Sequence, residues 1–163
     1  MKQAEEILQI LKNNFPDFIL ELKNDQPTEP YIVVSPLEID RVCAFLHDSS
    51  DLLFDSLMNL SGVDEPKTSL LGVYYHLEST TIKHKITLKV STDRNKPEVA
   101  TVTSVWKGAD WHEREAYDMF GISFLNHPDL RRILMPYDWA DGSHPLRKDY
   151  KNPEFYQGMK VPY

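Results

Sequence analysis

Residues 69–90, SLLGVYYHLESTTIKHKITLKV, contain the pattern that decides the fold. In the second half of this stretch apolar and polar side chains alternate, as they do on the buried and solvated faces of a strand. The inward set is Ile82, His84, Ile86, Leu88 and Val90, and the outward set is Lys83, Lys85, Thr87 and Lys89. Because residues 78–81 are short enough for a hairpin, the stretch predicts antiparallel strands at 69–77 and 82–90, with the lysines in solvent.

The flanking sequence adds helices and strands on the N-terminal side. Residues 2–14 predict a helix whose buried face is Ala4, Ile7, Leu8 and Leu11. Residues 17–22 and 31–34 predict strands separated by the turn-rich NDQPTEP, and another strand is expected near 52–60.

Two more helices are predicted from local signals. Ser35, Pro36 and Glu38 have the spacing of a capping box, which would open a helix with a buried stripe of Ile39, Val42, Cys43 and Leu46. Residues 97–106, PEVATVTSVW, predict a short helix with Val99, Val102 and Trp106 inward. This order of elements predicts an α+β domain at residues 1–125, with helices packed on an antiparallel or mixed β-sheet.

Composition limits the function. The 163 residues suit one soluble domain, and a formal charge of −7 argues against a nucleic-acid binder. The single cysteine, Cys43, excludes an internal disulfide and an iron–sulfur cluster held by this chain alone. Because the chain lacks a long apolar run and its first residues do not resemble a secretory signal, we expect an intracellular protein without a redox centre of its own.

Residues 126–163 differ from the rest, since they hold five of the eleven prolines together with Trp139, Phe155 and four tyrosines. Frequent proline disfavours helices, whereas the aromatic content is too high for ordinary disorder. We therefore expect an extended C-terminal arm that lies across a partner. Its predicted apolar anchors are Trp139, Leu146, Phe155 and Tyr156, and its predicted partners for foreign carboxylates are Arg131, Arg132, Arg147 and Lys148.

The segment from Asp110 to Gly121 predicts a charged helix. Asp110 and Glu113 have capping-box spacing at its start, and Gly121 is placed to end it. An Arg114–Asp118 pair at i, i+4 would merely support the helix. The alternative is a preorganised ion-pair network formed by Glu115, Asp118, Arg131 and Arg132.

A metal or hydrolytic site is the competing interpretation of the same segment. His112 and Glu115 stand at i, i+3, and Asp118 could join them in a metal-dependent hydrolase. The repeated Glu-x-x-His units of di-iron proteins are missing, as are His-Glu-x-x-His and Gly-x-Ser-x-Gly motifs. His127 and His144 each precede proline, where an imidazole commonly caps a turn.

Two motifs resemble one known family. The run from Glu113 to Phe120, EREAYDMF, is followed at fixed spacing by His127, Arg131 and Ile133-Leu134. A second run, HPLRKDY at 144–150, follows Asp138-Trp139. Together they resemble the signature of the C subunit of bacterial complex I, the 30-kilodalton subunit family of NADH:quinone oxidoreductase. This sequence departs from the family pattern at Ser143, where glycine is usual, and at Lys151, where proline is usual.

The resemblance implies a subunit of the peripheral arm, beside the quinone-site D subunit and the iron–sulfur subunits, on the cytoplasmic side of the bacterial inner membrane. It implies that FMN and the iron–sulfur clusters belong to partner chains, and that this chain holds no cofactor and is not catalytic alone. The homologous subunit of a membrane-bound hydrogenase or a related dehydrogenase is the alternative. The expected interface residues are Glu113, Arg114, Glu115, Asp118, His127, Arg131, Arg132, Trp139, His144, Pro145, Leu146, Arg147, Lys148, Asp149 and Tyr150.

Overall fold

The predicted hairpin is the centre of a five-stranded sheet in the computed structural model, which describes residues 2–24 and 29–161. Strands β4 (Leu70–Glu78) and β5 (Lys85–Asp93) pair antiparallel. The sheet order is β1-β2-β5-β4-β3, with β1 at Ile19–Lys23, β2 at Tyr31–Val34 and β3 at Ser56–Glu65. Only β2 and β5 run parallel within it, so the sheet is mixed and the predicted α+β class is confirmed.

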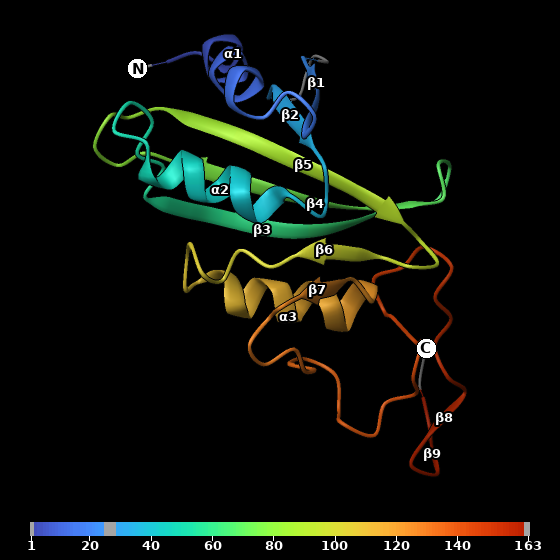
Figure 1. The fold of residues 1–163 in the computed structure, drawn as a ribbon. Coiled ribbons are helices and arrows are strands. Elements are labelled where there is room, and N and C mark those ends of the chain that lie inside the picture. The colour runs from blue at the N-terminus through green and yellow to red at the C-terminus, as the bar shows by residue number, and fades with distance from the viewer. Residues whose placement is uncertain (1, 25–28, 162–163) are drawn as a thin grey trace.

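Three helices cover one face of this sheet. Helices α1 (Ala4–Asn14) and α2 (Ile39–Asp48) bury the two predicted stripes of apolar residues. Helix α3 (Ala109–Phe120) packs at the β3 edge, where Phe120 lies against Gly62. Gly62 pairs with Val73, whose side chain belongs to the same core as α1 and α2, so all three helices share a face. Figure 1 shows α1 at the β1–β2 end of the sheet and α3 at the β3 end.

Four predicted elements are wrong in type or bounds. The strand predicted at 82–90 spans Lys85–Asp93, because residues 79–84 form the connection from β4. Helix α2 begins only at Ile39, because residues 35–38 form a turn and Glu38 pairs with Arg41 instead of closing a capping box. Residues 97–106 form the short strand β6 (Glu98–Ala100) and turns, in keeping with their β-branched side chains. The predicted strand at 52–60 begins at Ser56, since residues 50–55 turn the chain.

The side chains that were predicted to face inward in these segments are nevertheless buried. Val99, Val102 and Trp106 are buried, although no helix presents them. His84 is 1% exposed and stacks on Phe54, as predicted for a core histidine.

The predicted solvated face of β5 is wrong at two residues. Thr87 is 6% exposed and lies within hydrogen-bonding distance of His76 Nδ1, and Lys89 is buried as well. Lys89 is 9% exposed, its Nζ lies 2.5 Å from Glu65 Oε1, and it sits over the rings of Tyr31 and Tyr74. Neighbouring strands thus supply a carboxylate and two aromatic faces that a single-strand pattern does not reveal.

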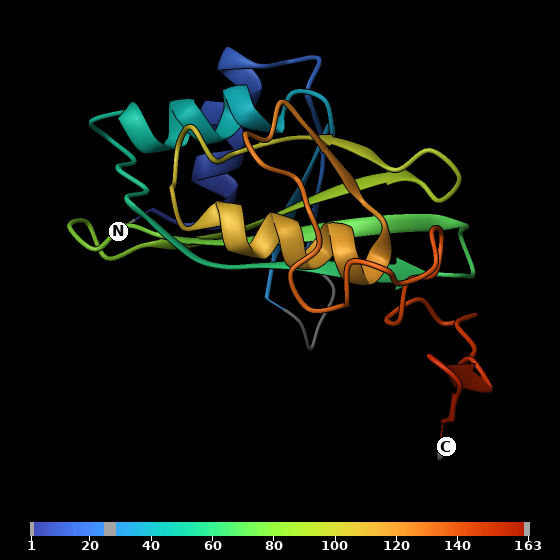
Figure 2. The same cartoon turned by 90° about the horizontal axis from the view of Figure 1, so that it is seen from below.

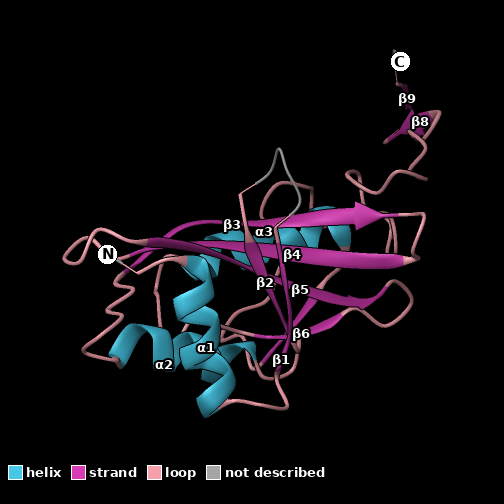
Figure 3. Ribbon diagram, turned by 90° about the horizontal axis from the view of Figure 1, so that it is seen from above, coloured by secondary structure: helices cyan, strands magenta, loops and turns pink. Residues whose placement is uncertain are grey.

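The chain after α3 first adds a strand to β6, in a two-stranded sheet separate from the five-stranded one, and then leaves it. Strand β7 (Ser123–Leu125) pairs parallel with β6. Residues 126–150 run back along α3 without forming a helix, and a two-stranded hairpin of β8 (Phe155–Tyr156) and β9 (Met159–Lys160) follows. Figures 2 and 3 both show this hairpin projecting away from the sheet.

Candidate functional site: the charged helix and its clasp

The two sequence motifs meet at the C-terminal end of α3. The last carbonyls of a helix lack partners within it and need donors from elsewhere. Gly121 donates its N–H to Tyr117 O, and three donors from the HPLRKDY run cover the next three carbonyls. His144 Nδ1 lies 3.1 Å from Asp118 O, Leu146 N donates to Met119 O, and Arg147 Nε donates to Phe120 O at 2.7 Å.

Gly121 makes this arrangement possible. It ends α3 with φ +75°, a left-handed conformation that favours glycine, and a side chain there would overlap the His144 ring. Burial lowers the pKa of His144, the bond to Asp118 O opposes that effect, and Arg147 and Arg132 add to the lowering. His144 is therefore a neutral imidazole that donates through Nδ1. It was predicted to cap a turn, and in the structure it caps the C-terminal end of α3 instead.

Asp118 binds the segment that follows β7. One carboxylate oxygen accepts the backbone N–H groups of Ile133, Leu134 and Met135 at 2.8–3.1 Å. The other oxygen accepts from Arg132 at 3.1 Å. Burial alone would raise the pKa of Asp118, but these four hydrogen bonds together lower it below its usual value.

Arg114 holds the same segment from the next turn of the helix. Its guanidinium donates to the carbonyls of Arg131 and Arg132 and lies 5.1 Å from the ring centroid of Trp111. The predicted Arg114–Asp118 pair is therefore wrong, because each side chain binds the backbone of the returning segment.

The predicted four-residue network is only half correct. Asp118 and Arg132 form its ion pair, with side chains 0% and 14% exposed. Arg131 instead pairs with Asp129 at the surface, and Glu115 is exposed on the outer face of α3.

A further clasp joins the second motif to the sheet. Lys148 N donates to Asp64 Oδ2 at 2.7 Å, and Arg94 bridges Asp64 and Asp149. Arg132, Arg147 and Asp149 are thus engaged within the chain, whereas the pairing of Arg131, Arg132, Arg147 and Lys148 with a partner's carboxylates stays a prediction. Asp64 and Arg94 were not among the residues predicted from the sequence. Asp64 has the same strand parity as the buried Leu60, so alternation in β3 could have revealed it.

Glu113 lies on the buried side of α3. It is 0% exposed, accepts from Thr101 Oγ1 at 2.5 Å and from Val102 N at 2.8 Å, and so joins α3 to the loop after β6. This contact replaces the predicted capping box with Asp110, which lies in the first turn after the N-cap Gly108. Burial raises the pKa of Glu113 to about 7, although both hydrogen bonds oppose the rise and Asp110 adds to it.

His127 faces the same carboxyl. Its side chain is 0% exposed and its Nδ1 accepts from Asp129 N at 3.0 Å, so the predicted turn cap is confirmed. Its Nε2 lies 3.6 Å from Asp110 Oδ1 and 3.9 Å from Glu113 Oε2.

The raised pKa of Glu113 predicts a pH-dependent free energy of unfolding. An acid whose pKa rises from 4.5 to about 7 on folding stabilises the folded state below pH 4.5, and this contribution is lost as the pH rises toward 7. The full difference corresponds to roughly 3 kcal/mol. Glu113→Gln remains neutral and should flatten this dependence in urea titrations, whereas the exposed control Glu115→Gln should retain it. A wild-type chain with no such decline would contradict the assignment.

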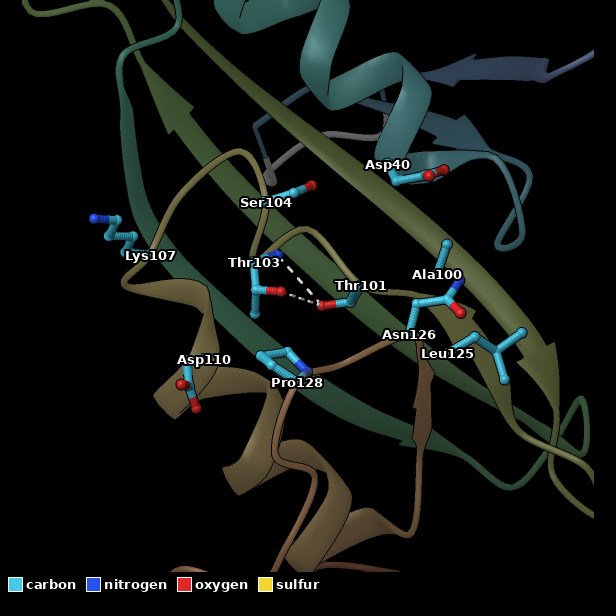
Figure 4. A pocket seen from close by; sticks show the side chains of 10 residues that line it. All are labelled: Asp40, Ala100, Thr101, Thr103, Ser104, Lys107, Asp110, Leu125, Asn126 and Pro128. Atoms are coloured by element: carbon cyan, nitrogen blue, oxygen red, sulfur yellow. Dashed lines mark hydrogen bonds between the residues drawn. The ribbon is translucent and has the colours of Figure 1, made fainter.

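Two depressions flank α3. A cleft of about 570 Å³ lies on one side, lined by Asp40, Ala100, Thr101, Thr103, Ser104, Lys107, Asp110, Leu125, Asn126 and Pro128 (Figure 4). A smaller groove of about 240 Å³, the α3–β3 groove, is lined by Asn59, Leu60, Ser61, Gly62, His112, Glu115, Ala116, Phe120 and Leu146.

The predicted metal set does not come together. Within residues 2–24 and 29–161, no three histidine, cysteine or carboxylate side chains are placed to hold a metal ion. His112 and Glu115 both border the α3–β3 groove, whereas the Asp118 carboxylate binds the backbone of residues 133–135.

The remaining predicted interface residues lie further along the arm. Trp139 packs against Tyr156 with ring centroids 5.4 Å apart, and Tyr156 donates to Asp138. Pro145 lies within the cap on α3, and Tyr150 N donates to Arg147 O. In the part of the chain that the structure describes, no helix is long and apolar enough to span a membrane.

Comparisons with known proteins agree with the two motifs. Residues 32–156 match the family described as respiratory-chain NADH dehydrogenase, 30 Kd subunit. The NADH-quinone oxidoreductase C subunit of Chlorobium phaeobacteroides is 40% identical, over 100% of this chain and 98% of its own length. Its counterpart in Chloroherpeton thalassium is 46% identical over 94% of this chain, which spans only 63% of that relative. The F(420)H(2) dehydrogenase C subunit of Methanosarcina mazei is 38% identical over 91% of this chain and 92% of its own length.

The fold has a solved counterpart as well. The structure described as the trypsin-resistant fragment (1–134) of Nqo5 superposes with a TM-score of 0.63 at 24% identity, covering 77% of this chain and 98% of that one. With the family match over residues 32–156 and a 40% identical relative covered almost end to end, this chain belongs to the 30-kilodalton subunit family of respiratory-chain NADH dehydrogenase, which includes the NADH-quinone oxidoreductase C subunits.

Proposed function

We propose that this chain is a non-redox assembly subunit of a proton-translocating NADH:quinone oxidoreductase, which positions the quinone-site subunit and the iron–sulfur subunits on the peripheral arm. One observation carries the proposal. Glu115 from the first motif and Leu146 from the second line the same α3–β3 groove, and both remain exposed while their neighbours are used to hold the fold together.

The groove suits a protein partner better than a substrate. Apolar side chains of Phe120 and Leu146 line it beside one carboxylate, the combination that an apolar anchor with an adjacent cation would fill. Trp111 on the same helix is 62% exposed. Its ring, which lies against the Arg114 guanidinium, is of a type enriched at interface hot spots.

The C-terminal hairpin supplies a second contact in this proposal. Phe155 and Met159 are 57% and 65% exposed on an element that projects from the sheet. Leaving such apolar surface in water costs about 25 cal/mol per Å², so a neighbouring subunit is its expected cover. In the free chain we expect fast amide exchange at residues 151–161 and slower exchange at 144–149, because only the latter bind α3 and Asp64.

Assembly can be separated from catalysis in the native host. Leu146→Asp and Glu115→Lys should reduce the amount of assembled complex by more than about tenfold, because each removes an interface contact of about 2 kcal/mol. Turnover per assembled complex should stay normal. Leu20→Asp is the matched control, since Leu20 is 60% exposed on β1, far from α3 in the sheet order. Normal assembly with reduced turnover per complex would contradict the proposal.

The Methanosarcina relative supports a second candidate, the equivalent subunit of a related dehydrogenase. The match covers nearly all of both chains, so this domain alone suits either complex. Deleting the chain and measuring quinone reduction in membranes with NADH and with reduced F420 as donors distinguishes the two, because only the complex that contains the chain loses its activity.

A further inference from the structure

A chain of two hydroxyl groups joins the buried Glu113 carboxyl to the cleft. Thr101 Oγ1 lies 2.5 Å from Glu113 Oε2 and 2.9 Å from Thr103 Oγ1. Thr101 is 8% exposed, whereas Thr103 is half-buried and lines the cleft with Thr101, as Figure 4 shows. Both separations are within hydrogen-bonding distance, so the three groups form a continuous path from the interior to the cleft.

We propose that Glu113 is a proton-exchange site and that Thr101 and Thr103 conduct its proton to the cleft. A hydroxyl can accept one hydrogen bond while it donates another, which proton transfer along a chain requires. Glu113 Oε2 gives its proton to Thr101 Oγ1 as the proton of Thr101 passes to Thr103 Oγ1. The Thr103 proton passes to a water or buffer base in the cleft. Three O–H bonds break, on Glu113, Thr101 and Thr103. New O–H bonds form on Thr101 and Thr103, the third proton bonds to the water or buffer base, and Glu113 remains as the carboxylate.

The other carboxylate oxygen of Glu113, Oε1, is not available to carry the acidic proton. Glu113 Oε1 accepts the Val102 N–H at 2.8 Å, so the acidic proton occupies Oε2, on the side of Thr101. After the proton has left, the Thr101 hydroxyl donates back to Oε2 and stabilises the new charge.

The groups around Glu113 set the pH at which exchange occurs. Burial raises its pKa to about 7 and Asp110 contributes to the rise. The Nδ1 atom of His127 accepts a hydrogen bond from Asp129 N, and its Nε2 lies 3.9 Å from Glu113 Oε2. From the sheet and α2, Tyr75 and Cys43 are fully buried, and burial, with Glu113 contributing, raises the pKa of both, so neither competes for the proton near pH 7.

The site goes beyond the assembly role and is testable on the free 163-residue chain. The Glu113 carboxyl is followed by ¹³C NMR for its titration midpoint, and by time-resolved infrared spectroscopy after a pH jump for its rate of deprotonation. Thr103→Val should slow deprotonation by at least about tenfold while the midpoint moves little, because Thr103 does not touch the carboxyl. Thr103→Ser retains a hydroxyl and should restore the rate.

Two further variants make the result decisive. Ser104→Ala removes another hydroxyl that lines the cleft and should change neither rate nor midpoint. Thr101→Val should both slow exchange and raise the midpoint, since Thr101 supplies a hydrogen bond that lowers the Glu113 pKa. A Glu113 midpoint at the ordinary value of 4.5 would overturn the proposal, as would equal rates in the wild-type chain, Thr103→Val and Thr103→Ser.

Discussion

Replacing Asp118 by alanine is expected to release residues 131–135 from α3 and to lower the free energy of unfolding by about 3–5 kcal/mol. The substitution leaves three backbone N–H groups without their acceptor and the Arg132 guanidinium, 14% exposed, without its buried counter-ion. Removing the Asp118 carboxylate costs more than the net stabilisation that its hydrogen bonds provide, because the donors that remain are buried without an acceptor. Urea unfolding gives the loss, and amide exchange at residues 133–135 locates it.

Asp141 provides the matched control. It also approaches Arg132, at 3.7 Å, but its side chain is fully exposed, so Asp141→Ala should change little. Equal losses in the two variants would show that Asp118 does not bind the returning segment.

Protonation of Asp118 in acid is expected to release residues 131–135 from α3. The hydrogen bonds that overcome burial lower the folded pKa of Asp118, so its stabilisation is complete above the ordinary carboxyl range. It is lost as the pH falls through the lowered folded value. Exchange at residues 133–135 should therefore accelerate in acid before the five-stranded sheet unfolds, and Asp118→Ala should show fast exchange at every pH.

Replacing Gly121 by alanine is expected to cost about 2–4 kcal/mol and to displace the His144 cap. Part of the cost, about 1–2 kcal/mol, is the left-handed backbone that Gly121 adopts at φ +75°. The rest arises because the added methyl group would overlap the His144 imidazole, which binds the Asp118 carbonyl. Thermal unfolding should show the loss, and the His144 Nδ1 resonance should report the broken bond.

Gly142→Ala separates the two contributions. Gly142 has φ +73°, and an added Cβ there would meet nothing within 4 Å, so this variant should show only the backbone cost. The double variant Gly121→Ala/His144→Ala should lose less stability than the sum of the two single variants. Once His144 is shortened to alanine, the methyl group at position 121 no longer overlaps an imidazole ring. Equal effects of Gly121→Ala and Gly142→Ala would mean that His144 does not pack on the helix end.

Local periodicity was sufficient for much of this fold. The antiparallel hairpin of β4 and β5, the buried stripes of α1 and α2, and Gly121 at the end of α3 are all visible in the sequence. Each depends on neighbours within a few residues, so a short window contains the information. The two motifs likewise identified the family, which the comparisons confirm.

Only the tertiary structure decided where the charged side chains bind. Arg114 and Asp118 could pair with each other by spacing, yet both bind a segment that returns 14 or more residues later. Lys89 looked solvated in its own strand, but Glu65 of β3 and two tyrosines from other strands enclose it. The parallel β2–β5 pairing and the meeting of Glu113 with Thr101 depend in the same way on elements distant in sequence. A charge binds whatever complementary group the fold brings within about 3 Å, and that group is set by chain topology, which a local pattern does not contain.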